Sequence, residues 1–169
     1  MKIMHKNILW MVLFGVLLPN FSQARDINLE LINAARAGRT SEVRDLIAEG
    51  ADINAANAAG KTVLMMAANF GNARIVDLLL AEGADVNAKD TQESTALIGA
   101  AYAGDLRVIK ALLAQETDVN IAAKNKITAM STAKTAGHEE VVKLLEAAAG
   151  KSGDDKSAKT KSKAKSKKK

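Results

Sequence analysis

Few side chains in this sequence of 169 residues could carry out chemistry. Cysteine is absent, which excludes disulfides, thiolate metal sites and cysteine nucleophiles. The histidines are His5 and His138, and His138 follows a glycine at the expected start of a helix. His5 lies in a segment that we expect to be removed as a signal peptide, and the one remaining histidine, without cysteine, offers too few ligands for a zinc site. We therefore expect a structural role for His138.

Three aspartates, Asp52, Asp85 and Asp118, recur at intervals of 33 residues. Acid–base catalysis needs two groups around one reacting bond, whereas this spacing places one carboxylate in each copy of a repeat. Each aspartate lies in an Asp-apolar-Asn sequence, a pattern typical of turns in which Asp and Asn side chains bond the local backbone. Glycine-rich phosphate loops are also missing. We expect no catalytic residue, no cofactor and no metal, and hence not an enzyme.

The elements that carry these residues repeat with the same period of 33 residues. Thr62, Thr95 and Thr128 fall in register at this offset. Glycines and leucines do so too, namely Gly38, Gly71, Gly104 and Gly137, and Leu46, Leu79, Leu112 and Leu145. So many coincidences at one offset indicate an internal repeat.

Each copy of the repeat predicts two short helices joined by a tight turn. Thr62 is placed to accept a backbone N–H as the N-cap of the first helix, and Gly71 supplies the left-handed residue that ends this helix. Val76, Leu79 and Leu80 recur at i, i+3 and i+4 and form the apolar stripe of the second helix. One helix pair cannot bury this stripe alone, so neighbouring copies must stack.

The chain resembles the ankyrin-repeat family over residues 60–71, Gly-Lys-Thr-Val-Leu-Met-Met-Ala-Ala-Asn-Phe-Gly, and residues 76–88, Val-Asp-Leu-Leu-Leu-Ala-Glu-Gly-Ala-Asp-Val-Asn-Ala. The resemblance implies an all-α solenoid of about four stacked helix–turn–helix units within a domain at residues 25–150. The units are expected at residues 28–56, 57–89, 90–122 and 123–150.

The sequence departs from the family pattern at two kinds of position. The histidine of the family's Thr-Pro-Leu-His motif is absent from every unit, and we expect Met65 and Ile98 to replace its hydrogen bonds by packing. Turn glycines are replaced by Glu93, Lys126 and Glu116. A residue other than glycine is strained at positive φ, so we expect the third and fourth units to be less stable, or differently turned, than the second.

Residues 1–24 have the order of a secretory signal peptide, with Lys2 and Lys6 before an apolar run from Ile8 to Leu18 and with small residues at both ends of the tripeptide Ser22-Gln23-Ala24. As a helix the run rises about 16 Å, against about 30 Å of membrane hydrocarbon. We expect a signal helix that is cleaved after Ala24, with no transmembrane span afterwards and with export to the periplasm or, alternatively, secretion. An uncleaved anchor and a buried core helix are the alternatives.

Charge is uneven along the sequence, although its net value is only +5. Residues 25–150 carry 13 basic and 17 acidic side chains, whereas residues 151–169 carry nine lysines and two aspartates. The segment 151–169 has no residue that could build a core, so we expect a disordered tail. Three roles stay open for it: a solvated tail, a tether to an anionic surface such as lipid headgroups, and a nucleic-acid arm, which the export signal disfavours.

The resemblance implies a protein-binding surface on the concave side of the stack. Phe70 and Tyr102 are the aromatic residues that remain after signal cleavage, and with Arg36 they would anchor a partner if exposed. The alternative is that either aromatic packs between repeats. The family's variable positions carry over to Arg36, Ala58, Ala59, Lys61, Asn69, Phe70, Thr91, Gln92, Ser94, Tyr102, Lys124, Asn125, Ile127 and Thr135.

These observations predict a non-catalytic module of the cell envelope that scaffolds, stabilises or inhibits a protein partner. Aromatic residues are too few for the stacking surfaces that bind single-stranded nucleic acid. The alternatives are a structural or surface-tethered envelope component that acts through its polybasic tail, and a secreted effector.

Overall fold

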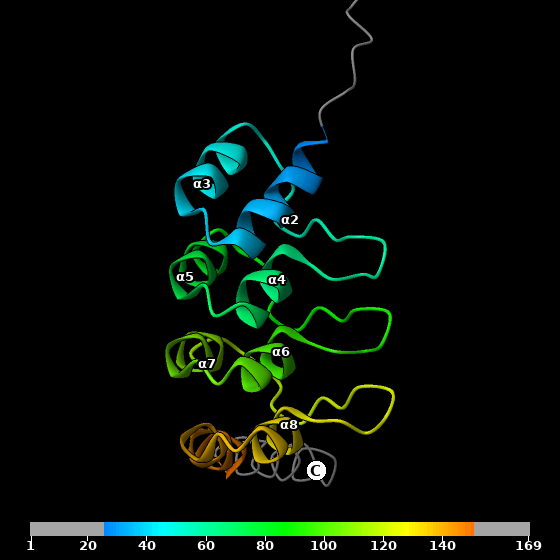
Figure 1. The fold of residues 1–169 in the computed structure, drawn as a ribbon, viewed down its shortest axis with the longest axis vertical. Helices are drawn as coiled ribbons and strands as arrows, with labels where there is room; N and C mark the ends of the chain where they lie inside the picture. The colour runs from blue at the N-terminus through cyan, green and yellow to red at the C-terminus, as the bar shows by residue number, and fades with distance from the viewer. Residues whose placement is uncertain (1–25, 151–169) are drawn as a thin grey trace, which may run out of the picture.

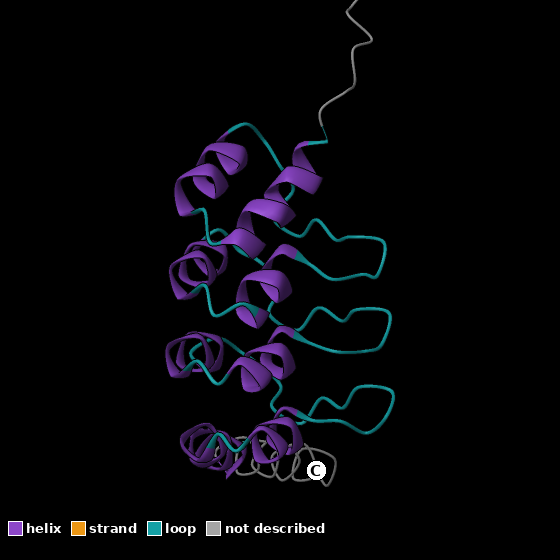
Figure 2. Ribbon diagram, in the orientation of Figure 1, coloured by secondary structure: helices purple, strands orange, loops and turns teal. Residues whose placement is uncertain are grey.

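The computed structural model describes residues 26–150, so the expected signal peptide and tail lie outside the described residues. Within residues 26–150 the regular structure is helical, with short bridges instead of strands (Figure 2). The helices form pairs, which are α2 (Ile27–Ala37) and α3 (Thr40–Ala48), α4 (Val63–Asn69) and α5 (Ala73–Ala81), α6 (Ala96–Ala103) and α7 (Leu106–Leu113), and α8 (Ala129–Ala136) with a helix over residues 139–150. The predicted all-α repeat architecture is confirmed.

The pairs stack into a solenoid with two rows of helices (Figure 1). The first helices α2, α4, α6 and α8 contact one another in order, and α3, α5 and α7 form the second row. Three hairpin loops, at residues 56–62, 89–95 and 122–128, project from the side of the first helices. Each repeat therefore has a front, made of its hairpin loop and first helix, and a back, made of its second helix.

The core follows the repeated apolar positions. Val76 and Leu79 are fully buried, as the helical stripe predicts, and Met65 and Ile98 are buried where the family pattern has histidine. Paired alanines on the first helices are inaccessible to solvent, which allows close helix stacking: Ala34 and Ala35, Ala67 and Ala68, Ala100 and Ala101. In the last repeat Lys134 takes the second alanine's place, and its Nζ lies 3.6 Å from Oε1 of Glu146 at the end of the stack.

The expected helix signals are present, with one exception. The Thr62 hydroxyl accepts a hydrogen bond from the Met65 backbone N–H at 3.2 Å, and Thr128 forms a reciprocal capping box with Ser131. Thr95 makes no such side-chain bond. Gly71 has a φ of 69°, which confirms its left-handed conformation. Identical residues at one repeat position therefore give similar, but not identical, caps.

The replaced turn glycines have two different outcomes. Glu93 and Lys126 adopt φ values of 61° and 58°, close to the 74° of Gly60, so these hairpins keep the glycine turn and are not differently turned. Glu116, by contrast, is not left-handed, and α7 ends one repeat position earlier than α3 and α5. The Thr117 hydroxyl donates to the Leu112 carbonyl at 2.5 Å. In the first two repeats the backbone N–H of the corresponding alanine bonds the equivalent leucine carbonyl.

Asparagines at the rim connect successive repeats. The Asn54 side-chain oxygen accepts from the Asp85 backbone N–H at 2.9 Å, and the Asn87 oxygen accepts from Asp118 at 3.0 Å. Asn28 accepts from Asp52 in the same way. Each aspartate carboxylate in turn accepts from the backbone N–H two residues later, as the sequence predicts for a turn. We call these links the asparagine ladder.

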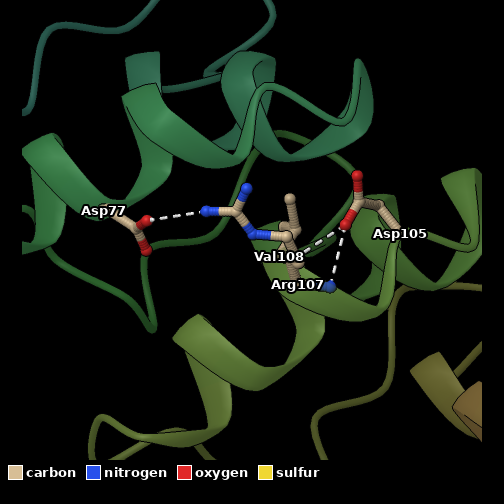
Figure 3. Close-up of polar contacts among 4 residues, drawn as sticks. All are labelled: Asp77, Asp105, Arg107 and Val108. Carbon is tan, nitrogen blue, oxygen red and sulfur yellow. Dashed lines mark hydrogen bonds and ion pairs between the residues drawn. The ribbon is translucent and has the colours of Figure 1, made fainter.

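The residue just before a second helix contacts the preceding repeat in two of the helix pairs, through Asn72 and His138. Nδ2 of Asn72 donates to the Ala35 carbonyl at 2.7 Å, and Nε2 of His138 lies 3.1 Å from the Tyr102 carbonyl. At the equivalent position the Asp105 carboxylate accepts from the backbone N–H groups of Arg107 and Val108 (Figure 3). The Arg107 guanidinium also lies 3.6 Å from the Asp77 carboxylate of the preceding repeat. These polar contacts supplement the apolar stacking along the back.

Candidate protein-binding groove

The chemistry-bearing side chains are engaged in the scaffold. The His138 ring lies against the Tyr102 carbonyl, and the carboxylates of Asp52, Asp85 and Asp118 accept backbone bonds within their turns. Over residues 26–150 no cluster of three or more histidine or acidic side chains is arranged to hold a metal ion.

No helix within residues 26–150 combines the length and apolar character needed to cross a membrane.

Two adjoining hollows lie on the front of the stack. The larger, of about 510 Å³, is formed mainly by α6, α8 and the hairpin before α8, and contains Tyr102 and Ile127. The smaller, of about 400 Å³, is formed by the end of α2, by α4 and by the adjacent hairpins. Asn69, Ser94 and Gly99 line both hollows. We call the two hollows together the groove.

Gly99 stands where the two hollows meet. It lies inside α6 and is not left-handed, so no turn requires a glycine there. One repeat earlier or later the same position holds Met66 or Thr132. A Cβ at position 99 would lie 3.3 Å from the Cβ of Asn69. Glycine in a helix interior costs about 1 kcal/mol relative to alanine. Here its missing side chain leaves the groove open between the hollows.

Nine of the fourteen expected contact residues line the groove, which are Arg36, Ala59, Lys61, Asn69, Phe70, Ser94, Tyr102, Ile127 and Thr135. The side chains of Phe70 and Tyr102 are 53% and 68% exposed, so the alternative that they pack between repeats is wrong. Ser94 is half-buried, and the other eight residues are exposed to solvent.

The other five expected residues are exposed on the hairpins but line neither hollow: Ala58, Thr91, Gln92, Lys124 and Asn125. The backbone of the hairpins is nonetheless connected here. The Thr91 N–H donates to the Ala59 carbonyl at 3.1 Å, and the Lys124 N–H donates to the Gln92 carbonyl at 2.9 Å. These bonds keep the hairpins side by side and so fix one wall of the groove.

Sequence reasoning missed a second row of lining residues. Met66, Gly99 and Thr132 lie three positions before the helix-end contacts and therefore one turn back on the same face. Ser131 and Ile98 line the larger hollow as well. The i, i+3 spacing on a helix was the signal that could have identified the row.

The repeat fold does not require aromatic side chains at positions 70 and 102. The other three repeats have alanine at the position of Phe70, namely Ala37, Ala103 and Ala136. The position of Tyr102 is held by Arg36, Asn69 and Thr135. A repeat at this site can therefore be built with small or polar residues, and the two exposed aromatics need another explanation.

A model of the ankyrin-repeat family, in three copies, matches residues 31–123, more than half of the chain. The chain belongs to the ankyrin-repeat family. Ankyrin repeats form protein–protein interaction modules, and a fourth helix pair continues the stack beyond the matched residues. A search among curated proteins finds no match.

Proposed function

We propose that this ankyrin-repeat protein is a non-catalytic module of the cell envelope that binds a protein partner in the groove, and thereby holds, stabilises or inhibits it. The observation that carries the proposal is the exposure of Phe70 and Tyr102 within the groove. Aromatic and arginine side chains dominate the energetics of protein interfaces, and Arg36 lines the same hollow as Phe70.

The groove also has the composition expected of a binding surface. Its larger hollow combines apolar side chains, Ile98 and Ile127, with the hydroxyls of Ser131, Thr132 and Thr135. Buried apolar area supplies affinity, while a few polar groups fix the orientation of the partner. The lining comes from four successive repeats, so a bound segment would run along the stack.

The test is partner capture by the full chain and by matched variants. We expect Phe70→Ala combined with Tyr102→Ala to lose a partner that the unaltered chain retains from an envelope extract, as measured by quantitative mass spectrometry. The control is Leu29→Ala, because Leu29 is 50% exposed on α2 but lines neither hollow. Circular dichroism should show equal helicity in all three chains. Undiminished capture by the double variant would place the binding surface elsewhere.

Location in the envelope is supported by the order of charged, apolar and small residues within 1–24. We expect the exported protein to begin at Arg25, with an intact mass that lacks residues 1–24. Trp10 is the single tryptophan of the sequence, so the exported protein should also lack tryptophan fluorescence. A full-length mass with retained tryptophan emission would argue against cleavage after Ala24.

A second function is favoured by the nine lysines within residues 151–169, namely attachment of the module to an anionic envelope surface. Lysines near an anionic bilayer contribute about 1 kcal/mol each, and salt screens this attraction. Truncation after Gly150 should weaken low-salt binding to vesicles that contain anionic lipid, without changing helicity. Unchanged vesicle binding would remove the tether, and loss of localisation on truncation would favour it over the groove.

A further inference from the structure

The fold separates charge between the two sides of the stack. The fronts of the repeats, at residues 27–37, 56–69, 89–103 and 122–136, carry six basic and three acidic side chains. The other described segments from residue 38 onward, which are the second helices and the turns on either side of them, carry six basic and thirteen acidic side chains. The basic residues of the front are Arg36, Lys61, Lys89, Lys124, Lys126 and Lys134. A body of net negative charge thus has a basic front.

Two of these cations line the groove. Arg36 and Lys61 border the smaller hollow, both are exposed, and neither takes part in an ion pair with another residue that the structure describes. Asp90 borders the same hollow but is buried, and its Oδ1 accepts from the backbone N–H groups of Gln92 and Ser94 at 2.8 and 2.9 Å. The Asp90 carboxylate is thus bonded within its own hairpin, whereas the two cations face solvent.

The larger hollow differs, because no Asp, Glu, Lys or Arg lines it. Its walls are the Tyr102 ring, Ile127 and a row of serine and threonine hydroxyls. The groove therefore runs from a cationic end over α2 and α4 to an uncharged end over α6 and α8. A ligand that matches the whole groove needs negative charge at one end only.

We infer that the groove binds an acidic segment of the partner protein, with a carboxylate against Arg36 and Lys61 and an uncharged apolar side chain against Tyr102 and Ile127. The inference rests on the proposed function and specifies the chemistry of the partner. Complementary charge steers association and sets orientation, and the acidic side chains of the second helices and turns disfavour binding of the same partner there.

Charge also disfavours two other ligands of the groove, the protein's own C-terminal segment and nucleic acid. The protein's own segment 151–169 carries nine lysines and two aspartates, so it has the same sign as the front and is repelled from it. A nucleic acid would need cations along its whole length, since affinity for nucleic acid comes mainly from neutralised phosphates. The uncharged larger hollow does not provide them. An acidic protein segment satisfies both ends of the groove.

The test uses a random peptide library displayed on phage and selected against the full chain. We expect the selected peptides to be enriched in Asp or Glu together with an aromatic or aliphatic residue. A synthetic peptide of the selected sequence is then titrated in fluorescence anisotropy. Arg36→Glu combined with Lys61→Glu should weaken its binding by about tenfold or more, because like charges then face each other. A peptide with its acids changed to lysine should bind this variant better than it binds the unaltered chain.

The matched control makes the same charge change on the back. Arg74→Glu combined with Lys110→Glu alters two exposed cations of α5 and α7 and should leave peptide affinity unchanged at moderate salt. Both double variants should keep the helicity of the unaltered chain, because none of the four side chains forms a hydrogen bond or an ion pair with another residue that the structure describes.

The outcomes separate the inference from the function on which it rests. The inference of an acidic partner is overturned if the selected peptides show no enrichment in acidic residues, or if they bind the Arg36→Glu, Lys61→Glu variant as well as the unaltered chain. If such peptides still lose affinity on Tyr102→Ala, the groove remains the binding site. Peptides indifferent to Tyr102→Ala, or a library that yields no binder, overturn the proposed function as well. Displacement of the peptide by a single-stranded oligonucleotide at equal concentration would show a general polyanion site and also overturn the inference.

Discussion

The asparagine ladder gives a quantitative prediction about stability. Asn87→Ala should destabilise the protein more than Asn54→Ala, and Asn120→Ala should have the smallest effect. The three residues occupy one repeat position and follow the same Asp-apolar dipeptide, so local turn propensity changes equally in the three variants. They differ in the bonds that their side chains make to other parts of the stack.

The magnitudes follow from those bonds. The Asn87 side chain accepts from Asp118 N–H at 3.0 Å and donates to the Glu116 carbonyl at 2.8 Å. Asn54 has one such bond to the next repeat, from Asp85 N–H at 2.9 Å. The Asn120 side chain has none with another described residue. At about 1 kcal/mol net per bond, the expected losses are roughly 2, 1 and 0 kcal/mol.

The measurement is urea unfolding of the full chain followed by far-UV circular dichroism, which reports the helices of every repeat. Tryptophan emission is unsuitable because the sequence has one tryptophan, Trp10, and it is not among residues 26–150, which the structure describes. Equal slopes in urea would show that the variants unfold the same surface, so that midpoints can be compared. Equal losses at all three positions would refute the reasoning, because they would trace the effect to the turn and not to contacts between repeats.

Three further predictions use the same measurement. Gly104→Ala should lower the stability of the protein more than Gly137→Ala does. Both glycines are left-handed, but only a Cβ at position 104 would meet another residue, the His138 ring, 2.5 Å away. In a His138→Ala background the two substitutions should differ less in their effect on stability. Thr117→Val should cost about 1 kcal/mol through loss of its hydroxyl bond; no loss would make that bond irrelevant. Glu93→Gly should stabilise by up to about 1 kcal/mol, since relief at a φ of 61° exceeds the entropy cost of glycine; a clear loss would contradict this.

The helix pairs and their stacking could be predicted because their signals are local and repeated. Thr62, Gly71 and the stripe of Val76 and Leu79 each act within one turn or one helix, and the structure shows each in its expected role. In a solenoid each unit contacts only its neighbours, so a correct unit and a correct period nearly determine the fold. The expected concave contacts followed from the same register, and most of them line the groove.

Features that depend on how two repeats stack could not be predicted from the sequence of a single repeat. Asn54 bonds a backbone group 31 positions away, which becomes apparent only once the turns are aligned in space. Glu93 keeps a glycine-like turn because the hairpin around it is fixed by bonds to its neighbours, which outweigh the preference of a single residue. Gly99 shapes the groove because it has no side chain, and this matters only because Asn69 of α4, in the preceding repeat, lies beside it.

Folding and binding draw on different residues in this protein, which makes the two separable by experiment. Stacking relies on buried alanines and leucines and on polar links at the rim and back. Helices α4 and α6 carry no charged side chain, and each packs between the first helices of the two adjacent repeats. Charge on the front is therefore confined to α2, α8 and the hairpins, where Arg36 and Lys61 have no ion-pair partner among the described residues. Reversing these two charges should change recognition while the stack stays intact, so a loss of binding in that variant reports on the groove itself.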